Sequence, residues 1–185
     1  KQSAWGLVAA VGGVPTGWTH AFVNVYETAE DLANSASNWD PSSVLGIDQS
    51  LLNTVKLTDG GFSVQNWAVQ TSLSAGERTA ESVTVWNFAR PENLAGFINE
   101  NKTLWRKQFE TDMGGRISWG VGLKLNNRSQ NLSSVMTWDR YPSLADAYEA
   151  LNQYEGGFSR ASKMDEYDPD GWTAQVIVSD VMWVD

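Results

Sequence analysis

An internal repeat constrains the fold of this chain more than any other feature of its sequence. Ala4-Trp5-Gly6, which precedes a predicted strand, recurs as Ser118-Trp119-Gly120 before another strand. In both copies there follow an apolar strand ending in an aromatic and an acidic residue, a helix opened by a hydroxyl residue, and an Asp-Gly turn before a last strand. The apolar strands are Phe22 to Glu27 and Val135 to Asp139, and the helices open at Thr28 and Ser143. The turns are Asp59-Gly60 and Asp170-Gly171, and the last strands are Phe62 to Val69 and Trp172 to Val184. The sequence therefore predicts two related halves, residues 1–75 and 80–185, in one globular unit.

The second half contains a strand and a helix that the first half lacks. Val83 to Phe88 is predicted to be a strand, and apolar residues at helical spacing follow Pro91 as far as Gly114-Gly115. Between Arg116 and Leu125 large apolar residues alternate with small or polar ones, which indicates a strand with two different faces. The predicted order of the second half is β-α-β-β-α-β, and the first half has the same order without its first strand and helix.

This order resembles the ferredoxin-like repeat of the dimeric α+β barrel superfamily, in which two such units pack sheet to sheet around a cavity. The resemblance covers nearly the whole chain. It implies an α+β fold in which two ferredoxin-like repeats with antiparallel sheets form an intrachain pseudo-dimeric barrel, the first repeat being incomplete. A lipocalin-like or other closed barrel is the alternative, and the predicted helices argue against it. The incomplete repeat leaves a sheet edge that a second copy could cover, which predicts a homodimer.

Charge and composition argue against several classes of function. A net charge of −9 repels the phosphates of nucleic acids and anionic lipid, and no segment approaches the ~20 apolar residues of a membrane-spanning helix. The absence of Cys excludes thiol nucleophiles and Cys-ligated metals, and a single His excludes sites that need two. A calcium loop from Glu166 through Asp168 and Asp170 lacks its closing carboxylate, because Ile177 stands there. No metal, cofactor, nucleic acid or membrane partner is predicted, and the compartment is open.

Ten tryptophans are the most unusual feature of the composition. Several fall on predicted strands, where the rings could line a pocket for a flat or apolar molecule or could fill a core. Cores are more often built from Leu, Ile and Val, which favours the pocket. The residues expected to bind ligand are Trp5, Trp86, Trp119 and Trp138. Gly120 and Gly122, inside a predicted strand, are expected to allow close approach of a backbone or a ligand.

Two residues carry a closer resemblance, to the antibiotic-biosynthesis monooxygenases and related haem-degrading enzymes of the same superfamily. In that family an Asn on the first strand and a Trp at the end of the third orient an oxidisable substrate and oxygen. Asn87, within Val85 to Phe88, and Trp138, within Met136 to Asp139, look like these two positions. The haem-degrading members also need a His on the next helix, and residues 143–153 contain none. The resemblance therefore implies a cofactor-independent oxygenase.

Three more residues could activate a substrate: His20, which is the only histidine, Tyr26 and Arg116. For His20 the alternative is a strand-end side chain in solvent. A serine nucleophile elbow at residues 157–161 fails because Ala161 replaces its last glycine. Three functions remain: a protein that binds a small apolar or aromatic molecule, a cofactor-independent monooxygenase or isomerase, and a structural or interaction module. Binding is preferred because it needs only a cavity with an aromatic lining.

Overall fold

The computed structural model of the chain describes residues 2–13, 19–37, 65–125, 133–153 and 162–184. The strands are β1 (Gln2–Gly12), β2 (His20–Tyr26), β3 (Trp67–Ser74), β4 (Val83–Ala89), β5 (Ser118–Lys124), β6 (Val135–Tyr141) and β7 (Trp172–Val184). The helices are α1 (Ala29–Ser37), α4 (Leu94–Glu100), the π-helical segment η1 (Asn101–Trp105), α5 (Arg106–Thr111), α6 (Leu144–Gln153) and α7 (Met164–Tyr167). No helix within these residues is long and apolar enough to cross a membrane.

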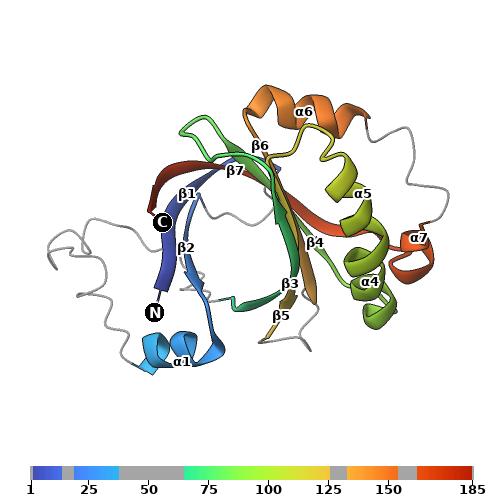
Figure 1. Cartoon of the computed structure of the whole chain (residues 1–185), viewed down its shortest axis with the longest axis horizontal. Coiled ribbons are helices and arrows are strands. Elements are labelled where there is room, and N and C mark those ends of the chain that lie inside the picture. Colours follow the sequence, from blue (N-terminus) through green and yellow to red (C-terminus); the bar gives the residue numbers. More distant parts are fainter. Residues whose placement is uncertain (1, 14–18, 38–64, 126–132, 154–161, 185) are drawn as a thin grey trace, which may run out of the picture.

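All these strands join one antiparallel sheet of seven strands in the order β2-β1-β7-β4-β6-β5-β3. The sheet curls into a half-barrel, so that β1 and β2 lie across from β3 and β5 (Figure 1). The protein therefore has an α+β fold. We call the concave side of the curl, which carries the packed residues Val8, Val176 and Trp86, the inner face. The opposite side is the outer face.

Most of the predicted elements are present. The strands predicted in the second half all occur, and the helix that follows Pro91 ends at Thr111, before Gly114 and Gly115 with φ of 56° and 78°. In the first half β2 and α1 also occur where they were predicted.

The strand predicted at residues 62–69 is present from Trp67, and it ends later than predicted, because β3 continues to Ser74. It continues because Thr71 is buried and Leu73 packs in the core, while Ser72 between them faces the other way. Residues 59–60, 62–64 and 157–161 lie outside the described part of the chain.

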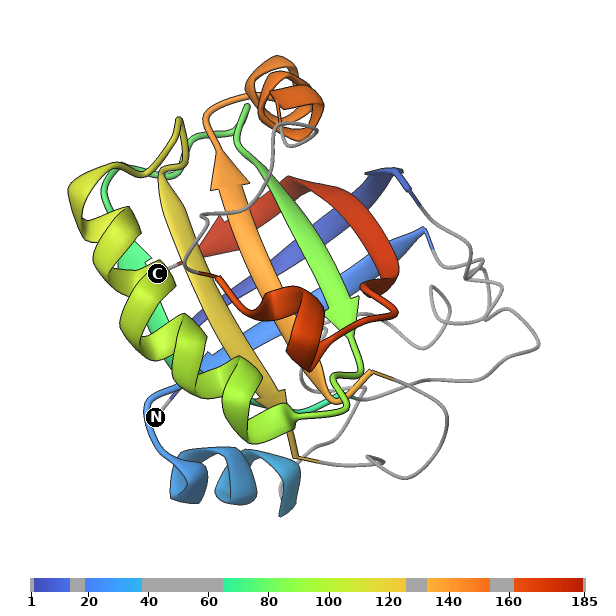
Figure 2. The ribbon, with the colours of Figure 1, turned by 90° about the vertical axis from the view of Figure 1, so that its right-hand side faces the viewer.

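The main core lies between the helices and the outer face of β4, β5 and β6 (Figure 2). Phe97, Trp105 and Phe109 from the helical segment pack against Trp119 and Val121 of β5, and none of them is more than 7% exposed. Burial of each such side chain is worth roughly 1.5–3 kcal/mol, so this cluster is a main source of stability. A second cluster lies beneath α6 and consists of Val83, Val85, Tyr141, Ala147 and Ile177.

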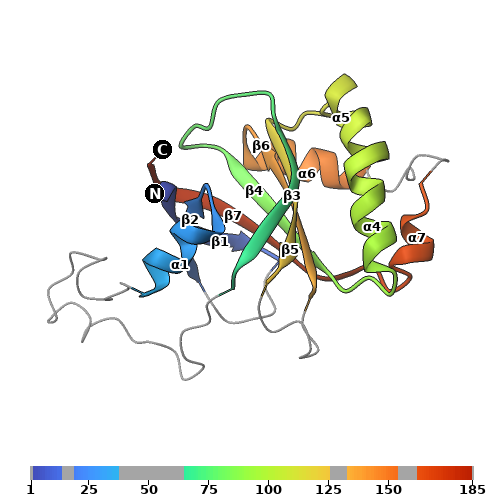
Figure 3. The same ribbon diagram turned by 60° about the horizontal axis from the view of Figure 1, so that its bottom comes forward.

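The outer face of β1, β2 and the end of β7 exposes apolar side chains. Phe22 and Met182, which flank Leu7 in the register, are 48% and 45% exposed, and Val184 is 44% exposed. Helix α1 lies at the end of β2, away from the helices that cover the main core (Figure 3). The Tyr26 hydroxyl lies 2.7 Å from the Ser35 hydroxyl of α1 and fixes this helix to the strand.

Candidate functional site

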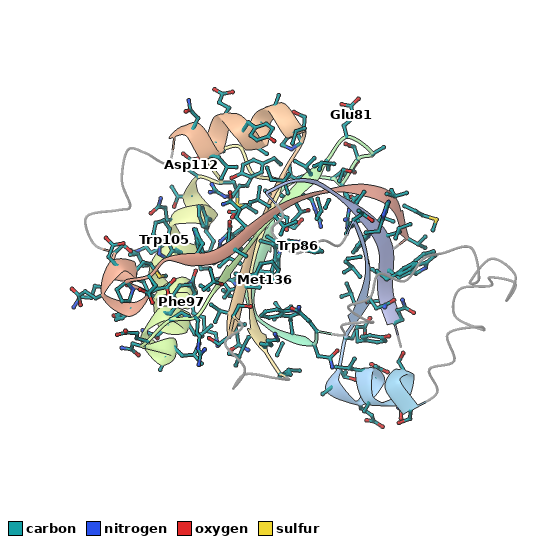
Figure 4. All side chains as sticks on the ribbon, turned by 180° about the vertical axis from the view of Figure 1, so that it is seen from behind. Glu81, Trp86, Phe97, Trp105, Asp112 and Met136 are labelled. Carbon is teal, nitrogen blue, oxygen red and sulfur yellow. The ribbon has the colours of Figure 1, made fainter. Side chains whose placement is uncertain are left out.

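Aromatic side chains cover the centre of the inner face. Trp86 and Trp138 are direct partners in the register of β4 and β6, and Met136 is the partner of Phe88. The Phe88 ring centroid lies 5.9 Å from that of Trp67 on β3. Figure 4 shows Trp86 and Met136 at the sheet, with Phe97 and Trp105 on the helices beyond its other face. We call the inner-face residues Trp67, Trp86, Phe88 and Trp138 the aromatic strip.

Two glycines of β5 make room for the aromatic strip. A Cβ atom at Gly120 would overlap the Trp138 ring, and one at Gly122 would lie 3.3 Å from the Cβ of Trp67. The predicted close approach at these glycines is therefore present, and the approaching groups are tryptophan side chains of the same chain. The absence of a side chain at Gly120 leaves room for the Trp138 ring.

The tryptophans of the strip are not fully buried. Trp67, Trp86 and Trp138 all keep intermediate exposure. The core tryptophans Trp119 and Trp105, under the helices, are only 3% and 7% exposed. The helix-covered core is thus closed, while the strip keeps accessible aromatic surface.

A cavity of about 480 Å³ opens at one end of the strip. It lies where β3 ends and where β6 and β7 present their last residues. Among the described residues it is lined by Ser74, Gly76, Glu77, Arg78, Arg140 and Trp183. This is a polar cavity with one aromatic wall, in contrast to the apolar tryptophan-lined pocket predicted from the sequence. We call it the rim pocket.

Two arginines and one indole define the geometry of the rim pocket. The Cζ atoms of Arg78 and Arg140 lie 3.3 Å and 5.9 Å from the centroid of the Trp183 ring. Arg78 donates from Nε and Nη2 to the two carboxylate oxygens of Asp180. Arg140 donates from Nε to the Thr84 hydroxyl at 3.0 Å. Both guanidinium groups are therefore held in place by hydrogen bonds.

A third cation lies at the other end of the strip. Lys124, the last residue of β5, is 2% exposed, and its Nζ lies 5.6 Å from the Trp67 ring centroid. Burial lowers the pKa of this ammonium group from 10.5, because the charged form loses hydration. The strip is thus bounded by Arg140 at one end and Lys124 at the other.

Asn87 and Arg116 belong to a buried polar network on the outer face. Asn87 Nδ2 donates to Thr137 Oγ1 at 3.2 Å and to Asp139 Oδ2 at 3.1 Å, and Asn87 Oδ1 accepts from Gln175 Nε2 at 2.7 Å. Arg116 Nε donates to the other oxygen of Asp139. Every polar atom of the Asn87 side chain is therefore engaged by a neighbouring side chain.

The structure does not bring Asn87 and Trp138 to one space. Asn87 faces the helices with Thr137, its partner in the register, whereas Trp138 is the next residue along β6 and faces the inner side. Consecutive strand residues point to opposite faces, so one layer of sheet separates the two side chains.

The other predicted site residues are dispersed. His20 is exposed at the start of β2, with Nδ1 3.0 Å from the hydroxyl of the preceding residue. Tyr26 is hydrogen-bonded to Ser35 of α1. Trp5 lies three residues before the inward-facing Val8 on β1, so its side chain is on the outer face. Trp119 is in the main core, 4.9 Å from Phe109 between ring centroids. Of the predicted residues, only Trp86 and Trp138 share the inner face.

Sequence reasoning missed Trp67, Trp183, Arg78 and Arg140. The alternation Met136, Trp138, Arg140 on a predicted strand is a signal that could have identified the arginine. For Arg78, in a loop, no local pattern exists. Among the described residues no group of three or more His, Asp or Glu side chains is placed to hold a metal ion.

The chain matches no protein family model and no curated protein. A crystal structure of a Fusobacterium nucleatum subsp. nucleatum protein named "putative monooxygenase" is similar, with a TM-score of 0.57 and 13% identity over 99% of this chain and 79% of that chain. The structure of a major regulator of staphylococcal pathogenesis gives a TM-score of 0.42 and 10% identity over 68% of this chain and 75% of that one. The first likeness shows a shared fold, and the second is too weak to carry an argument.

Proposed function

We propose that the protein binds a small apolar or aromatic molecule on the inner face of its curled sheet. The observation that carries this proposal is the contrast in burial between the tryptophans of the aromatic strip and those of the main core. Accessible indole rings on a concave surface provide stacking and apolar burial for a flat ligand. The rim pocket, at about 480 Å³, is within the usual size range of small-molecule sites.

Titration of intrinsic tryptophan fluorescence tests this proposal. A panel of aromatic and lipid-like compounds, with haem included, is added to the purified protein. A saturable response is expected that disappears in Trp138→Ala and persists in Trp5→Ala, a matched control on the outer face of β1. Both variants must keep the far-UV circular dichroism of the parent. A panel without any saturable response would contradict the proposal and direct attention to protein partners.

A cofactor-independent monooxygenase is the second candidate, because the similar fold occurs in a protein named a putative monooxygenase. The engaged side chain of Asn87 ranks it below simple binding, since a substrate-orienting amide needs a free donor or acceptor. Oxygen consumption with any compound that binds is the test. Loss of activity with retained binding in Asn87→Ala would raise this candidate to first place, and no oxygen uptake would remove it.

We also propose that the fold is an incomplete barrel that lacks one of eight strands. In this proposal two ferredoxin-like repeats, residues 1–75 and 80–185, build it. Support comes from strand direction. The second half supplies the neighbouring strands β7-β4-β6-β5, with the first half pairing at both ends. Since all seven strands alternate in direction, the edge strands β2 and β3 run in the same sense. One further antiparallel strand between them would close the barrel.

A homodimer through the edge strand β2 is a further proposal. Edge strands are usually protected by charges, Pro or bulges, and residues 20–26 (His-Ala-Phe-Val-Asn-Val-Tyr) carry no Lys, Arg, Asp, Glu or Pro. The exposed Phe22 on the same strand adds apolar surface. Light scattering after size exclusion is expected to give twice the monomer mass for the parent and the monomer mass for Phe22→Lys. A monomer mass for the parent at about 20 μM protein, roughly 20 times a Kd of about 1 μM, would exclude the homodimer.

A further inference from the structure

We infer that the ligand of this protein is an aromatic carboxylate, held with its carboxylate group in the rim pocket and its ring on the aromatic strip. The inference rests on the proposed binding function and adds the chemical class of the ligand. It comes from three observations: the arginines that line the pocket, an unsatisfied donor on one of them, and the spacing between the pocket and the strip.

Two arginines line the rim pocket of a strongly acidic protein. The chain carries a net charge of −9, yet the described lining residues combine the guanidinium groups of Arg78 and Arg140 with one carboxylate, that of Glu77. Asp180 balances Arg78 from outside the lining and orients its planar group. Arginine is the side chain best suited to a planar carboxylate, because its N–H groups match the two oxygens. The Ser74 hydroxyl adds another donor to the pocket wall.

One nitrogen atom of the Arg78 guanidinium group has no hydrogen-bond acceptor among the described residues. Its Nη1 atom is buried and has no hydrogen-bond partner among the described residues, while Nε and Nη2 are bonded to Asp180. Buried donors in native proteins nearly always have a partner, so an unpaired one requires an explanation. An acceptor group delivered by a ligand, with a small shift of the side chain on the Trp183 ring, supplies that partner.

The distance from the pocket to the strip fits a short linker. Arg140 and Trp138 lie two residues apart on the same face of β6, and Thr84 and Trp86 are their partners on β4. Two residues of an extended strand span about 6.7 Å. An acid with one or two carbon atoms between carboxylate and ring therefore reaches the Trp138 and Trp86 rings when its carboxylate contacts Arg140.

Calorimetric titration at pH 7 with 1-naphthylacetate and 1-naphthylacetamide tests the inference, because the two compounds share ring and linker and differ in charge. The acid is expected to bind on the order of ten- to a hundredfold tighter than the amide, the range of a charge-assisted hydrogen bond. Arg140→Gln should abolish this preference. Arg90→Gln, at an exposed arginine directly after β4, is the control and should retain the preference.

A second variant guards against loss of binding through misfolding. Glu77→Gln removes the one carboxylate of the lining and should tighten acid binding severalfold without changing amide binding. A gain of affinity cannot come from an unfolded protein. Equal affinities of acid and amide in the parent would overturn the inference and leave the proposed function standing. An acid preference that neither variant alters would overturn the assignment to this pocket, and failure of every ring compound to bind would instead reject the proposed function.

Discussion

Replacement of Asp139 by Asn removes one negative charge from the buried polar network and preserves the size of the side chain. Arg116 donates to this carboxylate, and the two side chains are only 4% and 13% exposed. The variant leaves the guanidinium group buried without its carboxylate, which typically costs about 3–5 kcal/mol. A domain of this size is stable by roughly 5–15 kcal/mol, so the loss is a large fraction of the total. Asp139→Asn should therefore lower the urea midpoint markedly.

Urea unfolding at pH 7, followed by far-UV circular dichroism, measures this loss from the midpoint and the m-value. Glu110→Gln is the matched control, because it removes the acid from an exposed pair with Arg106 whose side chains are 41% and 48% exposed. Its cost should stay below about 0.5 kcal/mol.

The double variant Arg116→Met/Asp139→Leu should lose less than Asp139→Asn, since it removes both charges. A cost for Asp139→Asn no larger than that of the control would refute the reasoning. It would mean that water reaches the network, and Asn87 and Arg116 would again be candidates for chemistry.

Two further predictions follow from the sheet and from a raised pKa. Gly120→Ala, whose Cβ would overlap the Trp138 ring, should cost about 1–3 kcal/mol and shift tryptophan emission, while Gly122→Ala, with its nearest contact at 3.3 Å, should change unfolding free energy by less than about 1 kcal/mol. Burial, and secondarily the charge of Asp170, raises the pKa of Asp168 from 3.8 to about 6. The folded protein therefore gains stability as the pH falls from about 6 towards 3.8, by at most about 3 kcal/mol, and urea midpoints of Asp168→Asn should lack this increment.

Regular elements could be predicted because their patterns are local. The alternation from Arg116 to Leu125 indicated a strand with two faces, and the structure buries Trp119 and Val121 under the helices while Gly120 faces inward. The end of β3 was predicted too early because Ser72 and Ser74 weaken the apolar signal of a strand that pairs with β5 along its length. Pairing partners far apart in sequence do not appear in local periodicity.

The candidate site was less predictable, for two physical reasons. A shift of one residue on a strand reverses the face, so Asn87 and Trp138 looked like partners in the sequence although a sheet separates them. The rim pocket also combines a loop residue, Arg78, with residues of β6 and β7 that meet only in the folded chain. Its one sequence signal was Arg140, at the inward-facing position after Trp138.

The inner face of the central strands narrows the chemistry that the protein can perform. On β4, β5 and β6 the inward positions of the register contain only two ionisable side chains, Arg140 and Lys124. Arginine keeps its proton in proteins, so it can bind and orient an anion and does not act as a general base. Lys124, with a lowered pKa, is the one inward group of these strands with a titration shifted towards neutral pH. On these three strands general acid–base catalysis would need Lys124, whereas recognition of an aromatic anion needs only the arginine and the rings.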